Sequence, residues 1–259
     1  MTVPAIRMTE PVGPAGAPLV VLGPSLGTSA ILWEDVVPLL AADYRVCAWD
    51  LPGHGDAPAA TEPFTVGEIA DAVAAAVAET GADRILYAGV SLGGAVGLEL
   101  MLRHPRLVDA AAIVCSGAKL GDEEAWRERA AQVRAQGTSS LVTASAGRWF
   151  APGSLERRPE IGGRLLHALR DTDDENYALC CEALAVYDVR DRLARIEVPV
   201  AAVWAEFDAV TPEASAVEIA EGVRDGRVLR IDDASHLAPA EQPDAAAVLL
   251  RGFFAEAAR

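Results

Sequence analysis

The chain has 259 residues, of which 51% are hydrophobic and 23% are charged, and this composition suits a folded domain with a sizeable core. Its formal net charge of −16 argues against binding to nucleic acids or anionic membranes, because phosphate recognition needs clustered Lys and Arg. The first residues show no basic segment followed by an apolar stretch, and no apolar run is long enough for a bilayer, so we expect a cytoplasmic protein without a membrane partner.

Short apolar runs alternate along the chain with longer helical patterns. Buried strands are expected at residues 18–23, 44–50, 84–90, 110–117, 198–206 and 226–232. Between them, Ala-rich or amphipathic stretches such as residues 65–80 and 92–105 predict helices. Alternation of this kind predicts the α/β class, with a mostly parallel central sheet covered by helices on both faces.

The alternation stops between residues 118 and 193. This stretch is helical in pattern, is more charged than its surroundings, and contains two of the five tryptophans. We expect it to form a helical cap, inserted into an α/β core made of residues 1–117 and 194–259.

The pattern G-x-S-x-G occurs twice, at residues 23–27 (GPSLG) and 89–93 (GVSLG). It is typical of a nucleophilic serine on a sharp turn between a strand and a helix. In the second copy only Ser91 separates a predicted strand from an apolar helix, so we predict Ser91 as the nucleophile. Gly89 and Gly93 would leave room for the tight turn, and the helix N-terminus favours developing negative charge.

The first copy is followed by two residue types that commonly cap helices, and the next helix is expected to begin near Ala30. Enzymes with this motif take one oxyanion amide from the residue after the nucleophile and another from an early loop. We therefore predict an oxyanion hole formed by the amides of Leu92 and Leu26. Pro24 has no N–H, Ser25 is the alternative donor, and an ordinary Gly/Pro loop is the plainer interpretation.

Only four histidines are present, and His236 is the one in a loop after the last predicted strand. The chain order Ser…Asp…His requires the general base at this place. His104 lies at a helix end, where we expect it to cap the helix or lie on the surface, and His167 lies on a polar helix of the cap. His54 follows a strand near the active edge, where we expect a structural role.

The acid that orients the base should follow a strand between Ser91 and His236. Asp208 meets this condition after the strand expected at residues 198–206, and Glu206 is its nearest rival. In this role Asp208 would fix the histidine tautomer and stabilise the imidazolium, while the histidine would accept and return the serine proton.

The chain carries no signature of a cofactor. No G-x-G-x-x-G or G-x-x-x-x-G-K pattern indicates a nucleotide site. The four cysteines, none of them in a C-x-x-C arrangement, indicate neither a disulfide framework nor a zinc site. We expect an enzyme without metal or cofactor, and the sequence leaves its oligomeric state open, a homo-oligomer included.

Together these motifs resemble the α/β-hydrolase superfamily over the whole chain, and more closely the 3-oxoadipate enol-lactonases of the β-ketoadipate pathway of aromatic catabolism. The closer similarity lies in SLGT of the first glycine loop, RWF of the cap, YDVRDRLARIEVPV at the end of the cap, and DASH around the base. This resemblance implies hydrolysis of a small anionic enol-lactone to 3-oxoadipate. The chain departs from the family in the proline of GPSLG and in Glu206 and Phe207 before the acid, and neither departure removes a catalytic group.

An anionic substrate of an acidic protein needs a local positive contact. Trp126 and Arg129 share one face of a predicted cap helix, so Trp126 would pack over the lactone ring and Arg129 would meet the carboxylate. Arg148, beside Trp149, is the rival. In the alternative interpretation the arginines are solvated and the tryptophans belong to the cap core, and contact between the Ser25 hydroxyl and the substrate stays open.

Other functions fit the same motifs. A carboxylesterase, a cofactor-free perhydrolase-type enzyme and a C–C bond hydrolase would use the same scaffold, and fold alone does not separate them. A ligand receptor on this fold could keep the triad without turnover. The resemblance favours the lactonase among these alternatives.

Overall fold

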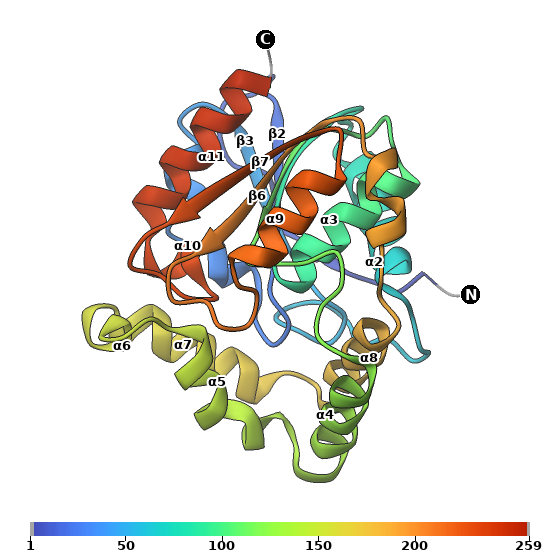
Figure 1. Ribbon diagram of the computed structural model, residues 1–259, viewed down its shortest axis with the longest axis vertical. Coiled ribbons are helices and arrows are strands. Elements are labelled where there is room, and N and C mark those ends of the chain that lie inside the picture. Colours follow the sequence, from blue (N-terminus) through green and yellow to red (C-terminus); the bar gives the residue numbers. More distant parts are fainter. Residues whose placement is uncertain (1–2, 258–259) are drawn as a thin grey trace.

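The computed structural model describes residues 3–257, which form a twisted seven-stranded sheet with helices on both faces (Figure 1). The strand order is β1-β3-β2-β4-β5-β6-β7, and every pairing is parallel except that of β1 with β3. The strands are β1 (Arg7–Met8), β2 (Leu19–Gly23), β3 (Arg45–Asp50), β4 (Ile85–Val90), β5 (Val108–Val114), β6 (Pro199–Ala205) and β7 (Asp225–Ile231).

Two groups of helices cover the sheet (Figure 1). One face carries α2 (Val66–Glu79), α3 (Leu92–Arg103) and α9 (Glu213–Gly222), and the other carries α1 (Val37–Leu40) and α11 (Pro243–Ala257). The short helices η1 (Ala30–Trp33), η3 (Arg190–Arg195) and α10 (Ala238–Glu241) complete the core. Within the part of the chain that the structure describes, no helix is both long and apolar enough to cross a bilayer.

The expected strands are confirmed in place, and their ends differ from the predicted ones by up to three residues. The expectation of burial is wrong for β7, because β7 is the edge strand and most of its residues are exposed or half-buried. Strand β1 was not predicted, since two residues give no periodic signal. The α/β class and the mostly parallel sheet are confirmed.

Between β5 and β6 the chain forms a series of helices, which Figure 1 shows as a separate layer beside the core. They are α4 (Glu123–Gln136), η2 (Thr138–Leu141), α5 (Val142–Trp149), α6 (Ser154–Arg157), α7 (Pro159–Asp171) and α8 (Asp174–Ala185), and we call α4 to α8 the cap. The two ends of this segment meet. The Val189 amide donates to the Ala118 carbonyl at 2.9 Å, and the main chains of Lys119 and Asp188 form an isolated antiparallel β-bridge. The division at residues 118 and 193 remains a prediction.

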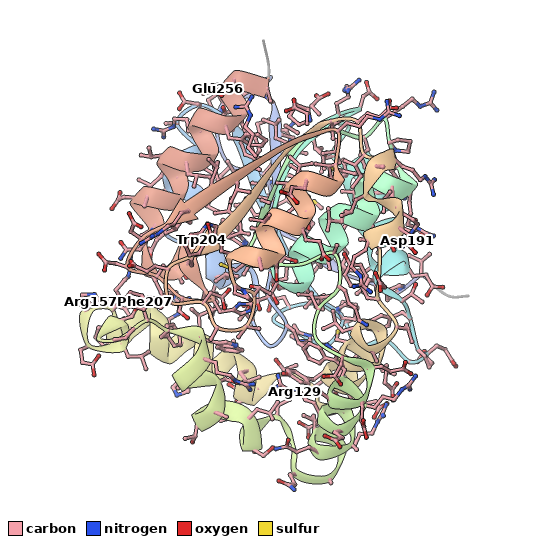
Figure 2. All side chains as sticks on the ribbon, viewed as in Figure 1. Arg129, Arg157, Asp191, Trp204, Phe207 and Glu256 are labelled. Atoms are coloured by element: carbon pink, nitrogen blue, oxygen red, sulfur yellow. The ribbon has the colours of Figure 1, made fainter. Side chains whose placement is uncertain are left out.

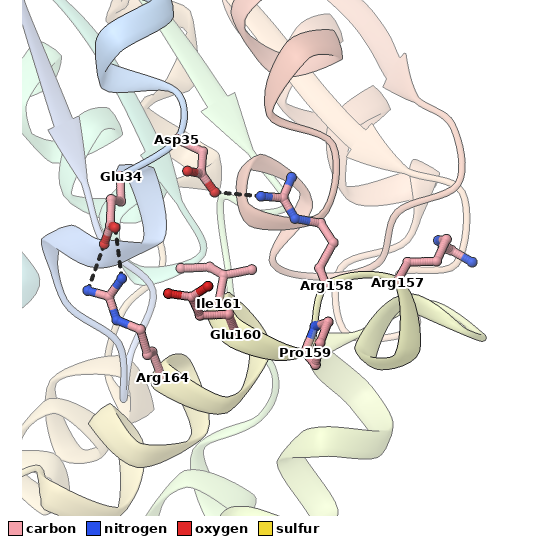
Figure 3. A pocket seen from close by; sticks show the side chains of 8 residues that line it. All are labelled: Glu34, Asp35, Arg157, Arg158, Pro159, Glu160, Ile161 and Arg164. Atoms are coloured by element: carbon pink, nitrogen blue, oxygen red, sulfur yellow. Dashed lines mark hydrogen bonds and ion pairs between the residues drawn. The ribbon is translucent and has the colours of Figure 1, made fainter.

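Two ion pairs join α7 and Arg158, the residue before it, to the segment that follows η1 (Figure 3). Arg158 binds Asp35 at 2.5 Å, and Arg164 binds Glu34 at 2.7 Å. Together they line a surface hollow of about 580 Å³, which contains none of the predicted site residues. Because these side chains are partly exposed, each pair is worth about 1 kcal/mol at most.

Candidate active site

Ser91 lies on a strained turn between β4 and α3. Its backbone has φ 54° and ψ −116°, a positive φ that is rare for any residue except glycine. The Ser91 amide donates to the Val114 carbonyl at the end of β5, and its carbonyl accepts the Ser116 hydroxyl at 2.7 Å. These contacts hold the turn in place, and α3 behind it is buried from residue 92 to residue 102.

The glycines on either side of Ser91 are required by close backbone contacts. A Cβ on Gly89 would lie 2.3 Å from the Gly93 carbonyl oxygen, and a Cβ on Gly93 would lie 2.5 Å from the Pro24 carbonyl oxygen. The Gly93 amide also donates to Pro24 at 2.9 Å. The two G-x-S-x-G segments therefore lie against each other, and their backbones are directly hydrogen-bonded.

Within the early loop, the Ser25 amide has an acceptor and the Leu26 amide has none among the described residues. The Ser25 amide donates to the Thr28 hydroxyl at 3.1 Å, and that hydroxyl donates to the Ser25 carbonyl at 2.8 Å. Among the hydrogen bonds of the described residues, none is donated by the amides of Leu26 or Leu92. This pattern favours Leu26 over Ser25 as the second oxyanion donor.

The helix after this loop begins at Ala30, as expected, but the side chain of Ser29 does not cap it. Asp50, at the end of β3, accepts the Ala30 amide at 2.6 Å and the Asp56 amide at 3.0 Å. Burial raises the pKa of Asp50, and the two amides partly offset that effect. The early loop is thus fixed by a carboxylate from a neighbouring strand.

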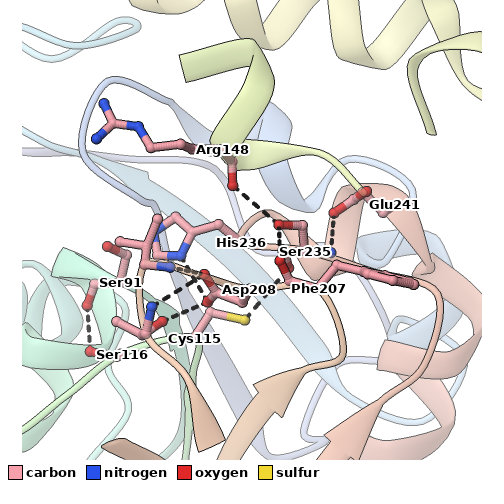
Figure 4. A network of polar contacts seen from close by, with 11 residues as sticks. Ser91, Cys115, Ser116, Arg148, Phe207, Asp208, Ser235, His236 and Glu241 are labelled. Atoms are coloured by element: carbon pink, nitrogen blue, oxygen red, sulfur yellow. Dashed lines mark hydrogen bonds and ion pairs between the residues drawn. The ribbon is translucent and has the colours of Figure 1, made fainter. Parts of the chain in front are cut away.

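The structure brings His236 and Asp208 together behind Ser91 (Figure 4). His236 Nδ1 lies 3.0 Å from Asp208 Oδ2, and both residues are buried. Ser91 and His236 line the same pocket. No hydrogen bond joins them among the described residues, and such contacts are often long in enzymes without substrate.

Asp208 is surrounded by donors that favour its charged form. The hydroxyl of Thr211 donates to Oδ2 at 2.6 Å, and the amides of Val210 and Thr211 donate to Oδ1 at 2.8 and 3.2 Å. Burial alone would raise the pKa of Asp208, but His236 and these donors together hold it below its usual value. The carboxylate is therefore ionised at neutral pH.

The pocket above Ser91 lies between the core and the cap. It has a volume of about 190 Å³, below the ~300–1,000 Å³ range of sites for drug-sized ligands, which favours a small substrate. The structure places all five predicted substrate contacts in its wall: Ser25, Trp126, Arg129, Arg148 and Trp149. Tyr177, Val210 and Leu120 also line it and were not singled out from the sequence.

The pocket holds two arginines without carboxylate partners. Among the described residues, neither Arg129 nor Arg148 forms an ion pair. Arg129, labelled in Figure 2 on the cap, lies 5.3 Å over the Trp126 ring and beside the buried Tyr177. Burial, and then the Arg129 cation, lower the pKa of Arg148. Two neighbouring cations without a counter-ion indicate a place for an anion.

The remaining histidines lie outside this pocket. His54 is fully buried, with Nδ1 2.8 Å from the Pro52 carbonyl, and burial lowers its pKa to about 4. His104 ends α3, and its Nε2 lies 2.8 Å from Asp71. Glu206, the rival acid, binds Arg230 and the Asp233 amide on the outer side of the loop.

Comparison with known proteins identifies relatives over most of the chain. A family model described as alpha/beta hydrolase fold matches residues 18–243. The 3-oxoadipate enol-lactonase 2 of Acinetobacter baylyi is 34% identical over 233 residues, which cover 90% of this chain and 87% of that protein. A pimeloyl-[acyl-carrier protein] methyl ester esterase of Neisseria meningitidis is 33% identical over 88% of this chain and 73% of that protein.

Solved structures give the same result. The enol-lactonase from Burkholderia xenovorans LB400 superposes with a TM-score of 0.92 at 29% identity, over 96% of each chain. The resemblance to 3-oxoadipate enol-lactonases is therefore confirmed, while relatives of similar identity include an esterase. Sequence and structure together show that the chain belongs to the α/β-hydrolase fold family.

Proposed function

We propose that this protein hydrolyses 3-oxoadipate enol-lactone to 3-oxoadipate. Ser91 is the nucleophile, His236 the general base and Asp208 the residue that orients the base. The observation that carries the proposal is one small pocket holding Ser91, His236 and two arginines without carboxylate partners. An uncharged ester offers these arginines no group of opposite charge, whereas the lactone carries a carboxylate.

In the first half-reaction, the Ser91 hydroxyl attacks the lactone carbonyl while His236 accepts its proton. The amides of Leu26 and Leu92 stabilise the tetrahedral oxyanion, each by about 2.7–4 kcal/mol. The ring C–O bond then breaks and expels an enolate, a better leaving group than an alkoxide. His236 returns the proton, and the enol tautomerises to the ketone.

In the second half-reaction, His236 takes a proton from water, which attacks the acyl-enzyme. The ester bond to Ser91 breaks, the serine regains its proton, and 3-oxoadipate leaves with a second carboxylate. No step needs a metal or cofactor. The same two steps would hydrolyse a simple ester, so the pocket wall must supply the selectivity.

The decisive experiment compares two substrates. The purified protein is expected to turn over the enol-lactone with loss of its ultraviolet absorbance, and with kcat/KM well above that for neutral aryl or methyl esters. Rapid hydrolysis of the neutral esters with no turnover of the lactone would contradict the proposal and indicate an esterase. Ligand binding without turnover of either substrate would indicate a receptor.

The arginine contact gives a second prediction. Replacing Arg129 or Arg148 by Gln is expected to raise KM for the lactone about tenfold or more, because a hydrogen bond between charged groups is worth about 1.5–3 kcal/mol. The effect on kcat should be small. Steady-state kinetics with the anionic lactone and a neutral aryl ester measure both constants.

Arg127→Gln is the matched control for this prediction. Arg127 lies on the same helix, but it is exposed and pairs with Glu123 at 2.8 Å. Its substitution should leave both constants unchanged. If Arg129→Gln and Arg148→Gln raise KM equally for charged and neutral substrates, the arginines shape the pocket instead of binding the carboxylate.

A further inference from the structure

Glu241 is a buried carboxylate that the proposed chemistry does not use. It is the last residue of α10, five positions after His236, and only 5% of its surface is exposed. Its Oε1 accepts the Ser235 amide at 2.6 Å, and its Oε2 accepts the Ala151 amide at 2.7 Å. One carboxylate therefore joins the cap to the loop that carries His236, residues 232–237, which we call the base loop.

Further bonds tie the same segments together (Figure 4). The Ser235 hydroxyl lies 3.1 Å from the carbonyls of both Arg148 and Phe207, and the Leu237 amide donates to the Trp149 carbonyl at 3.1 Å. The Phe207 amide in turn donates to Ala234. The base loop is thus bonded on one side to the loop of Asp208 and on the other to a cap segment, residues 148–151, that contributes two pocket-lining residues.

The burial of this carboxylate is unfavourable in itself. Burial raises the pKa of Glu241, an effect that the Ala151 and Ser235 amides, Ser154 and Arg157 only partly offset. Among the described residues, Glu241 forms no ion pair that would compensate its charge. An apolar residue would avoid this cost. A carboxylate, however, accepts one amide on each of its two oxygens, whereas a glutamine has only one accepting oxygen and an apolar side chain has none.

From this geometry we propose that Glu241 is a positioning residue that aligns His236 with Ser91 and, through residues 148–151, holds Arg148 and Trp149 at the pocket wall. The inference rests on the proposed roles of Ser91 and His236. It goes beyond them because it links the position of the base loop to the position of the cap segment, residues 148–151. A change at Glu241 must then disturb both the reactivity of Ser91 and the recognition of the charged substrate.

The variant Glu241→Gln tests this proposal, because it keeps the shape of the side chain and leaves one amide facing an N–H₂ group. The rate constant for sulfonylation of Ser91 by phenylmethanesulfonyl fluoride, a small uncharged reagent, reports the alignment of the base. We expect this rate constant, and kcat for a neutral aryl ester, to fall roughly 10- to 100-fold. KM for the anionic lactone should also rise several-fold, with KM for the neutral ester unchanged.

Glu206→Gln is the matched control. Glu206 also accepts an amide of the base loop, from Asp233 at 3.1 Å, but it is exposed, and among the described residues it has no hydrogen bond or ion pair to the cap. The Glu206→Gln variant should leave the sulfonylation rate constant, kcat for the neutral ester and both KM values unchanged. Ser154→Ala removes the buried hydroxyl that helps to lower the pKa of Glu241, and it keeps the charge of Glu241. The Ser154→Ala variant should change the same constants in the same direction as Glu241→Gln, but by less. If Glu241→Gln does not fold, Ser154→Ala serves as the test.

The outcomes separate the proposals. If the wild-type protein is not sulfonylated at Ser91, the triad itself is wrong. If the wild type reacts and the Glu241 and Ser154 variants lose only thermal stability, with sulfonylation and both KM values unchanged, the positioning role is overturned and Glu241 serves stability alone. A fall in reactivity with no change in KM for the lactone would overturn the link to the cap.

Discussion

Replacing Ser91 by Ala is expected to lower turnover by roughly 10⁴- to 10⁶-fold, the range of losses when a serine nucleophile is removed. The residual rate would come from the oxyanion amides and from binding. Because Ser91 holds a strained backbone through its main-chain bonds to Val114 and Ser116, the alanine variant should fold normally. Steady-state turnover and calorimetric binding of 3-oxoadipate measure the two effects separately.

Ser25→Ala is the natural control, since Ser25 occupies the middle of the other G-x-S-x-G segment and lines the same pocket. Its amide is already bound to Thr28, and its hydroxyl is not needed for the proposed chemistry. We expect kcat to change less than tenfold. A loss in Ser25→Ala that equals the loss in Ser91→Ala, or full activity of Ser91→Ala, would disprove the assignment of the nucleophile.

Replacing Asp208 by Asn is expected to lower kcat by about 10⁴-fold with little change in KM, because an amide in this place favours the wrong histidine tautomer. The Asn side chain can still accept from the Val210 and Thr211 amides, so the loop should keep its shape. Rate measurements with lactone, and a thermal melt of each variant, test this result. Glu206→Gln should retain full activity, and equal losses in both variants would leave the acid unassigned.

The lowered pKa of Asp208 also fixes its contribution to stability. A carboxyl group whose pKa is lower in the folded state stabilises the fold at pH values above its unfolded pKa, about 3.9, and loses that contribution as pH falls through the folded value. The Asp208→Asn variant should therefore melt at a lower temperature than the wild type at pH 7. Below pH 3 this difference should shrink.

The sequence predicted the features that depend on local pattern. Apolar runs placed the strands from β2 to β7, and G-x-S-x-G between a strand and a helix singled out Ser91. The chain order led to His236 and Asp208, which the structure places 3.0 Å apart. Their catalytic roles stay predictions, although Ser91 and His236 line one pocket and Asp208 is hydrogen-bonded to His236.

Other features depend on contacts between distant segments and left no local signal. Glu241 joins an amide 90 positions away, and Asp50 caps a helix 20 positions before it. Tyr177 reaches the pocket only because α8 packs against α4. The loop of Asp208 left a weak signal, since an aspartate commonly accepts from main-chain amides shortly after it, but the bond from the Thr211 hydroxyl required the structure.

The bond from the Gly93 amide to the Pro24 carbonyl has a consequence for evolution and protein engineering. It couples the loop of Leu26 to the turn of Leu92 through main-chain atoms, and no substitution of either leucine except proline would remove the two amides. If these amides form the oxyanion site, as predicted, selection acting on single side chains has little means of altering it. New substrate ranges on this scaffold should arise instead from changes in α4 and α5, whose side chains can vary while the reaction chemistry is preserved.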